Sequence, residues 1–193
     1  KDNFGVVPEH VLDPVLLLNK EKYLSIIDNK KSVSSNGKKG GLFSYILDSN
    51  HKKNNFISAV SNLLNLESFK TQPNKKISDF DGMGLADYRY PSIEEWLSSF
   101  NDADFIVTDS FHGTVLSIIF EKPFITIVNK ERGASRFESF LSLLGLSHRM
   151  IDNLSDFDES LLINDIDYNS IKHKIEDLRE VSIDFLKTNL HGK

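Results

Sequence analysis

The sequence contains no cysteine, and this absence removes several kinds of chemistry at once. Disulfide bonds, thiolate nucleophiles and cysteine metal ligands are all excluded. A chain without disulfides fits a reducing compartment, and we expect the protein to be cytoplasmic. Apolar residues also never continue for about 18 positions, the length that crosses a bilayer, so no membrane span is expected.

An excess of basic residues is lacking as well: 23 Lys and Arg stand against 28 Asp and Glu, a formal net charge of −5. No basic stripe with interleaved aromatic residues is visible, so nucleic acid is not an expected partner. The G-x-S-x-G, P-loop and G-x-G-x-x-G patterns are absent too. No motif therefore supports a hydrolase, a nucleoside triphosphatase or an enzyme that binds a dinucleotide, and no cofactor is expected.

What the chain does contain is an alternation of short apolar runs with segments of helical periodicity. Continuous apolar strands that alternate with helices predict a parallel sheet covered on both faces. We therefore expect an α/β fold with a Rossmann-like, doubly wound parallel sheet. The expected strands cover residues 41–48, 68–71, 104–108 and 123–128, and the expected helices cover 20–27, 56–64, 92–100, 114–120, 135–144 and 170–189.

Three parts of the chain are expected from this pattern. Residues 1–27 form a connecting arm with a helix, residues 28–167 form the Rossmann-like domain, and residues 168–193 form a C-terminal amphipathic helix that packs on it. Caps are predicted at three helix ends: Ser92 with Glu95, Ser135 with Glu138, and Gly145 as a C-terminal stop. The chain begins at Lys1 with neither an initiator Met nor a signal peptide, which indicates a piece of a longer protein.

Polar side chains follow the expected strands at three places, 48–50, 109–113 and 129–133. Because the carboxyl ends of parallel strands meet at one edge of a sheet, these groups are expected around a common crevice. The turn Asp109-Ser110-Phe111-His112-Gly113 is the most informative, because a helix is expected to start directly after it, at Thr114. The N-terminal N–H groups of a helix and its dipole attract anions, so the turn predicts a phosphate or carboxylate site.

Each of these residues also has a structural interpretation. Asp109 is as well suited to cap the following helix as to hold a ligand, and Ser110 fits either role. Lys130 and Arg132 suit an anion, but loop charges are usually only solvated. Arg136 lies in the first turn of its expected helix, where the dipole disfavours a cation, and this position indicates an anion nearby.

Metal binding has little support in the sequence. Asp79-Phe80-Asp81-Gly82 resembles a fragment of a calcium loop but lacks the remaining ligands, so an ordinary turn is expected. The histidines other than His112 are scattered without the spacing of metal ligands.

Several pieces of the chain, taken in order, resemble the carboxyl-terminal half of the polysaccharide pyruvyl transferases. The resemblance covers roughly residues 8–150, and the strand with its turn is the most specific part. The pieces are Val11–Leu18, Pro91–Leu97, Ala103–Val115, Pro123–Phe124, Arg136–Phe137 and Leu143–Leu146.

The resemblance implies one half of a two-domain enzyme with the GT-B fold and an active site between two Rossmann-like halves. It implies transfer of pyruvate from phosphoenolpyruvate onto two hydroxyls of a sugar, which gives a cyclic ketal in a capsule, exopolysaccharide or cell-wall polymer. The implied partners are the phosphoenolpyruvate donor, a saccharide or lipid-linked saccharide acceptor, and an amino-terminal half-domain that this chain lacks.

The family's histidine in this turn falls on His112, which the resemblance implies is catalytic and contacts phosphoenolpyruvate. Part of the family carries Arg two residues earlier, where this chain has Ser110, and Ser supplies no charged bidentate clamp. Lys130, Arg132 or Arg136 would then compensate. The predicted substrate-binding residues are Asp109, Ser110, Phe111, Gly113, Lys130, Arg132 and Arg136.

Two other functions stay open at this point. A non-catalytic domain that binds carbohydrate or anions would keep the scaffold without the arginine, and Ser110 favours it. A sugar-nucleotide glycosyltransferase domain would place its donor in the same half of the fold, although the chain has no clear nucleotide motif.

Overall fold

A computed structural model describes residues 9–28, 40–73, 84–128 and 133–190, with Gly5, Lys75, Ser78, Phe80 and Gly82 as isolated further positions. It contains a five-stranded, all-parallel sheet in the order β2-β1-β3-β4-β5, and the predicted α/β fold with a doubly wound sheet is thereby confirmed. The strands are β1 (Leu42–Tyr45), β2 (Ser68–Phe69), β3 (Phe105–Thr108), β4 (Phe124–Ile127) and β5 (Met150–Ile151).

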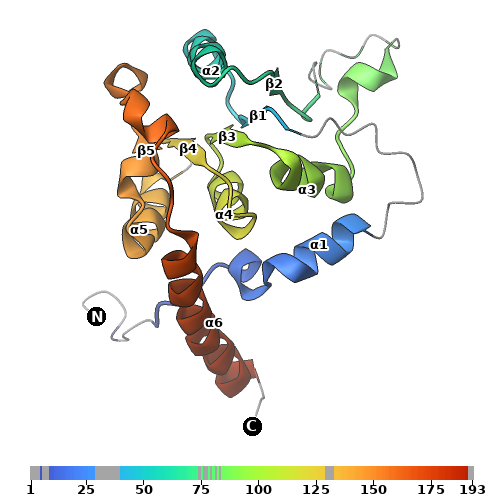
Figure 1. The fold of residues 1–193 in the computed structure, drawn as a ribbon. Helices are drawn as coiled ribbons and strands as arrows, with labels where there is room; N and C mark the ends of the chain where they lie inside the picture. The colour runs from blue at the N-terminus through green and yellow to red at the C-terminus, as the bar shows by residue number, and fades with distance from the viewer. Residues whose placement is uncertain are drawn as a thin grey trace.

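Helices surround this sheet on both faces, as Figure 1 shows, with α2 on one side and α3, α4 and α5 on the other. The helices are α1 (Lys20–Asp28), α2 (His51–Leu64), α3 (Ile93–Asp102), α4 (Phe111–Ile119), α5 (Ala134–Leu144) and α6 (Tyr168–Leu190). Short 3₁₀ helices are η1 (Pro14–Leu17), η3 (Leu85–Tyr88), η5 (Ser147–Arg149), η6 (Leu154–Asp156) and η7 (Glu159–Leu162).

Two apolar cores follow from the alternation of side chains along the strands. Phe43, Ile106 and Phe124 point into the larger core, which the helices α1, α3, α4, α5 and α6 complete. Their neighbours in the same strands point to the opposite face, where α2 and the segment around Leu154 cover them. Successive residues of a strand face opposite ways, so a sheet with two covered faces needs strands that are apolar at every position.

The arm is part of the larger core. Leu12, Leu16 and Tyr23 are buried in it, and the Leu12 N–H donates to Ser182 Oγ of α6 at 2.9 Å. Asp13 precedes Pro14, has extended backbone angles and caps η1, in agreement with the restriction that proline places on the residue before it. The division of the chain into arm, domain and terminal helix stays a prediction.

Some predicted boundaries are wrong. Helix α4 begins at Phe111 rather than Thr114, so His112 and Gly113 lie in its first turn and not in a preceding loop. The predicted cap by Ser135 and Glu138 is also wrong, since α5 begins at Ala134 after Gly133, which has a φ of 91° and makes no side-chain cap.

Other boundary predictions are confirmed. Ser92 and Glu95 form the reciprocal capping box at the start of α3, with both hydrogen bonds present. Gly145 ends α5 in the left-handed conformation, with a φ of 77°.

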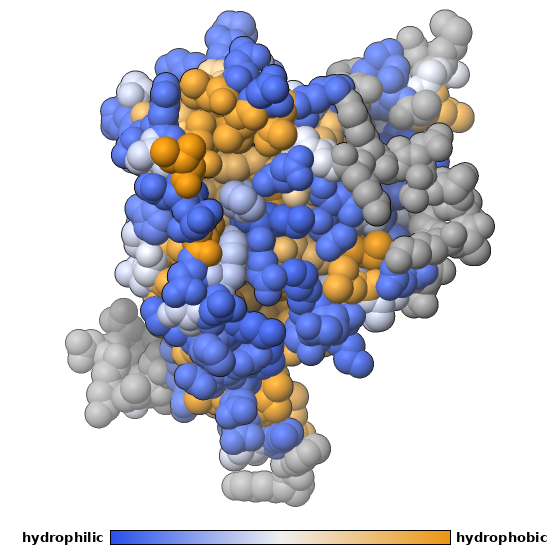
Figure 2. Space-filling model, in the orientation of Figure 1, coloured by the Kyte–Doolittle hydropathy of each residue, from blue (hydrophilic) through white to orange (hydrophobic). Residues whose placement is uncertain are grey.

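The surface is mixed in character. Figure 2 shows hydrophilic residues over much of one face, with apolar surface beside α2 and at the lower end of α6. Among the helices of the described residues, none has the length and apolar character that crossing a bilayer requires.

Candidate functional site

The strand order predicts a ligand crevice between β1 and β3. From β1 the chain moves outward to β2 on one side and through β3, β4 and β5 on the other, so the winding direction reverses between β1 and β3. Tyr45 and Thr108, the last residues of these two strands, are register partners. In open parallel sheets, ligands bind outside the carboxyl ends of the strands at such a reversal.

Asp109 lies buried at this point and holds the two strand ends together. Its carboxylate accepts hydrogen bonds from the N–H groups of Leu47 and Asp48, at 2.6 and 3.2 Å. Lys53 of α2 completes the set with an ion pair of 2.6 Å. The carboxylate therefore fixes the chain after β1 to the end of β3, and its role toward a ligand stays a prediction.

Ser110, and not Asp109, is the cap of α4. Its hydroxyl accepts from the Gly113 N–H at 3.3 Å, and its own N–H donates to Thr108 Oγ1 at 3.1 Å. A side chain at Gly113 would not fit, because a Cβ there would come within 2.2 Å of Thr108 Oγ1. The helix can thus start directly against the strand, with its first turn at the crevice.

His112 is the second residue of α4, and its side chain is 49% exposed. Its Nε2 lies 3.6 Å from Asp13 Oδ2, a carboxylate that the arm brings to the start of the helix. The ring also packs edge-on against Phe111, with 5.7 Å between the ring centroids. An accessible imidazole at a helix N-terminus can both bind an anion and exchange a proton.

Phe111 connects His112 to Arg136 in the first turn of α5. The Arg136 guanidinium lies 5.2 Å from the centre of the Phe111 ring, a cation–π distance. Phe137 and Phe140 hold the same ring from the side of α5, each with a centroid distance of 5.7 Å. Two helix N-termini, one with a histidine and one with an arginine, are therefore joined through a single aromatic ring.

A pocket of about 230 Å³ opens beside this group. Asp13, Phe111 and Arg136 contribute to its wall, together with His10. The rest of the lining is largely apolar and comes from the arm and α5: Val11, Leu12, Leu16, Ser139, Phe140 and Leu143. The Arg136 guanidinium beside an apolar wall suits a small organic anion.

Tyr45, the last residue of β1, lies beside the first turn of α4. It packs against Trp96 with 5.6 Å between ring centroids, and its ring would be 3.1 Å from a Cβ at position 113. Burial and the charge of Asp109 raise the pKa of Tyr45, so this phenol stays neutral around neutral pH.

Asp13, Lys53 and Tyr45 are neighbours of the turn that were not predicted from the sequence. The dipeptide Asp13-Pro14 carried a signal, because an acidic residue before proline is both extended and suited to capping. No local signal pointed to Lys53, because it is one of many polar residues in its helix. The predicted residues Lys130 and Arg132 lie outside the described residues.

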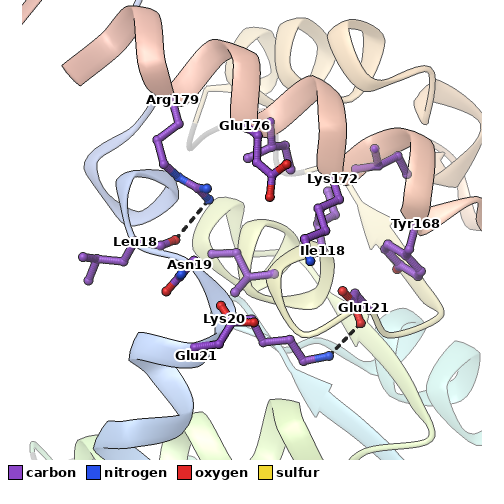
Figure 3. A pocket seen from close by; sticks show the side chains of 13 residues that line it. Leu18, Asn19, Lys20, Glu21, Ile118, Glu121, Tyr168, Lys172, Glu176 and Arg179 are labelled. Atoms are coloured by element: carbon purple, nitrogen blue, oxygen red, sulfur yellow. Dashed lines mark hydrogen bonds and ion pairs between the residues drawn. The ribbon is translucent and has the colours of Figure 1, made fainter. Parts of the chain in front are cut away.

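A larger pocket, of about 300 Å³, lies at the opposite end of α4. It is lined there by Ile118, Ile119 and Glu121, and by residues of α1 and α6 (Figure 3). A nine-residue helix is roughly 13 Å long, so this pocket is separate from the histidine crevice. Arg179 crosses it to the carbonyls of Leu16 and Leu18, and Lys20 pairs with Glu121 at 2.7 Å. These contacts hold the arm against α6 and against the end of α4.

Within the described part of the chain, no three His, Asp or Glu side chains come together as a metal site would require. Among the described residues, the groups around the start of α4 are an imidazole, a guanidinium, a carboxylate and helix N–H groups.

Comparison with known proteins gives a family match. The sequence model of the polysaccharide pyruvyl transferase family matches residues 1–131. This range includes the arm, the sheet through β4, and the α4 turn with His112, and it ends before Arg136. No curated protein gives a significant match to the chain.

Proposed function

This chain belongs to the polysaccharide pyruvyl transferase family, and we propose that it binds phosphoenolpyruvate as the donor for ketal formation on a sugar. In this proposal the chain is the donor-binding domain of a two-domain enzyme. The acceptor is a saccharide or a lipid-linked saccharide, and the second half-domain completes the cleft.

The observation that carries the proposal is the position of His112. It is half exposed on the first turn of α4, at the reversal point of the sheet, and Arg136 stands across Phe111 from it. Phosphoenolpyruvate carries a phosphate and a carboxylate. A cationic side chain together with two helix N-termini supplies complementary charge and N–H donors for both groups.

The reaction needs proton transfers that an imidazole performs well. A proton adds to the methylene carbon of the donor, and one sugar hydroxyl forms a C–O bond to the adjacent carbon and loses its proton. A second hydroxyl then bonds to that carbon as the C–O bond to phosphate breaks, and its proton passes to the departing phosphate, so the products are the cyclic ketal and inorganic phosphate. In its doubly protonated form His112 serves this sequence either by donating the first proton or by donating a hydrogen bond to a phosphate oxygen.

Arg136 takes over the charge that Ser110 does not supply. The Ser110 hydroxyl is engaged as the cap of α4 and the residue is buried, so it offers no cationic clamp. Arg136 lies in the first turn of the neighbouring helix and lines the pocket beside Phe111. A guanidinium can grip a phosphate or carboxylate with two parallel hydrogen bonds.

Thermal-shift titration tests the proposal. Phosphoenolpyruvate should raise the melting temperature of the wild-type chain, while His112→Ala and Arg136→Ala should each weaken its apparent affinity by about tenfold or more. His173→Ala is the matched control, because this histidine is 82% exposed on α6, and it should bind like wild type. A shift with sugar nucleotides alone would contradict the proposal and favour a sugar-nucleotide glycosyltransferase.

A second function, anion binding without catalysis, is favoured by Ser110 in the place of arginine. A measurement of inorganic phosphate released from phosphoenolpyruvate distinguishes a binding protein from a transferase. A complete enzyme that binds the donor but releases no phosphate with any sugar acceptor would be a binding protein.

A further inference from the structure

We infer that Asp13 is a positioning residue for His112, an inference that rests on the proposed function of that histidine. The two residues are far apart in the sequence and belong to different parts of the fold. Asp13 Oδ2 nevertheless lies 3.6 Å from His112 Nε2, within ion-pair distance. The arm thereby contributes a carboxylate to the crevice.

The two oxygens of Asp13 have separate roles. Oδ1 accepts from the Val15 N–H at 3.0 Å and caps η1, which fixes the side-chain rotamer. Oδ2 is left on the side of His112, and the carboxylate is only 25% exposed. A side chain that is already fixed by a cap can orient a partner without losing further conformational freedom.

The arm that carries Asp13 is anchored on both sides of it. Leu12 and Leu16 are buried in the core, and the Leu12 N–H is bound to Ser182. Arg179 Nε donates to the Leu16 carbonyl at 2.8 Å, and its guanidinium also reaches the Leu18 carbonyl (Figure 3). The position of the carboxylate relative to α4 is therefore set by the core and not by a loose loop.

Electrostatics gives this carboxylate a function. His112 lies in the first turn of α4, with the Asp13 carboxylate beside its Nε2. A carboxylate in this place favours the tautomer with the proton on Nε2. It also turns the ring about its side-chain bonds into one orientation, as the carboxylate does in Ser-His-Asp triads.

The variant Asp13→Asn separates positioning from structure. Its amide oxygen can keep the cap on Val15 while the negative charge is lost, and Asp184→Asn, on the exposed face of α6, is the matched control for charge removal. The readout is the imidazole ¹⁵N–¹H spectrum at a pH where the ring is neutral. The His112 signals, among those of six histidines, are assigned by their loss in His112→Gln.

In Asp13→Asn, we expect the His112 population with the proton on Nδ1 to increase about twofold or more, with an unchanged melting temperature. Asp13→Ala should show the same spectral change and also melt roughly 2–4 °C lower, because the cap is lost as well. A His112 tautomer ratio in Asp13→Asn equal to that of Asp184→Asn would overturn the inference.

Addition of phosphoenolpyruvate to the same samples distinguishes a failure of this inference from a failure of the proposed function. Movement of the wild-type His112 signals with phosphoenolpyruvate supports donor binding at this histidine. If they stay in place, the proposed function fails, while the ligand-free spectra still decide whether Asp13 orients the ring.

Discussion

At the scale of single residues, Asp109 shows that an acidic residue in a functional turn can serve mainly to assemble it. Its carboxylate is fully buried and meets two backbone N–H groups and one lysine. Replacement by Ala would leave Lys53 without its counter-charge and two N–H groups without their acceptor. Removing one member of such a buried pair costs about 3–5 kcal/mol.

We therefore expect Asp109→Ala to lower the free energy of unfolding, measured in urea, by about 3–5 kcal/mol. Asp184→Ala, an exposed carboxylate of α6, should change it by less than about 0.5 kcal/mol. The double variant Asp109→Ala, Lys53→Met should recover part of the loss, because neither charge is then left alone. Wild-type stability of Asp109→Ala would show that the carboxylate has no structural role.

How far the site could be predicted differs from residue to residue. The place of His112 at a strand end and beside a helix start is local information, and the sequence contains it. The partners of Asp109 are not local: they come from the chain after β1 and from α2, more than 50 residues away, and only the sheet order brings them together. The same reason applies to Asp13, whose contact with His112 depends on how the arm packs.

At the scale of elements, β1 to β4 were predictable from the sequence and β5 was not. β3 and β4 are buried at every position, and the predicted ranges agree with both within one or two residues. β5 has only two residues, directly follows the 3₁₀ helix η5, and was missed. The start of α4 was placed too late because His112 and Gly113 look like turn residues, although Gly113 is required by the close approach of Thr108.

The arm gives the second prediction of stability. Leu16 is 1% exposed and packs in the main core, while Leu18, two residues later, is 44% exposed. Leu16→Ala should therefore cost about 2–5 kcal/mol in urea unfolding, and Leu18→Ala is the matched control with less than about 1 kcal/mol. Equal, small losses in both variants would show that the arm does not belong to the folding unit.

At the scale of the whole molecule, two regions lie at the opposite ends of α4. Its N-terminus faces the crevice with His112, and its C-terminus faces the larger pocket, where the arm and α6 meet. The arm runs past both ends, since Asp13 touches His112 and Lys20 pairs with Glu121. Contacts between arm and α6 thus support the site from a distance, by holding Asp13 in place.

Ionisation of buried phenols should limit the stability of the molecule at alkaline pH. Burial raises the pKa of Tyr168, and its hydroxyl donates to the Lys122 carbonyl, which ties the start of α6 to the chain before β4. Burial raises the pKa of Tyr23 and Tyr45 in the same way. A phenol with a raised pKa in the folded state stabilises fully below the unfolded value, near pH 10, and loses this contribution as the pH rises further.

The variant Tyr168→Phe tests this pH dependence. It should lower the unfolding free energy at pH 7 by about 0.5–1.5 kcal/mol, the net value of a hydrogen bond, and should lose less than wild type between pH 9.5 and 11. Burial lowers the pKa of Lys122, which acts with the opposite sign up to its unfolded value near 10.5. The unfolding free energies of the wild type and of Tyr168→Phe are therefore compared with each other at each pH, by urea unfolding. An equal alkaline loss in both proteins would show that Tyr168 ionises as freely in the folded state as in the unfolded one.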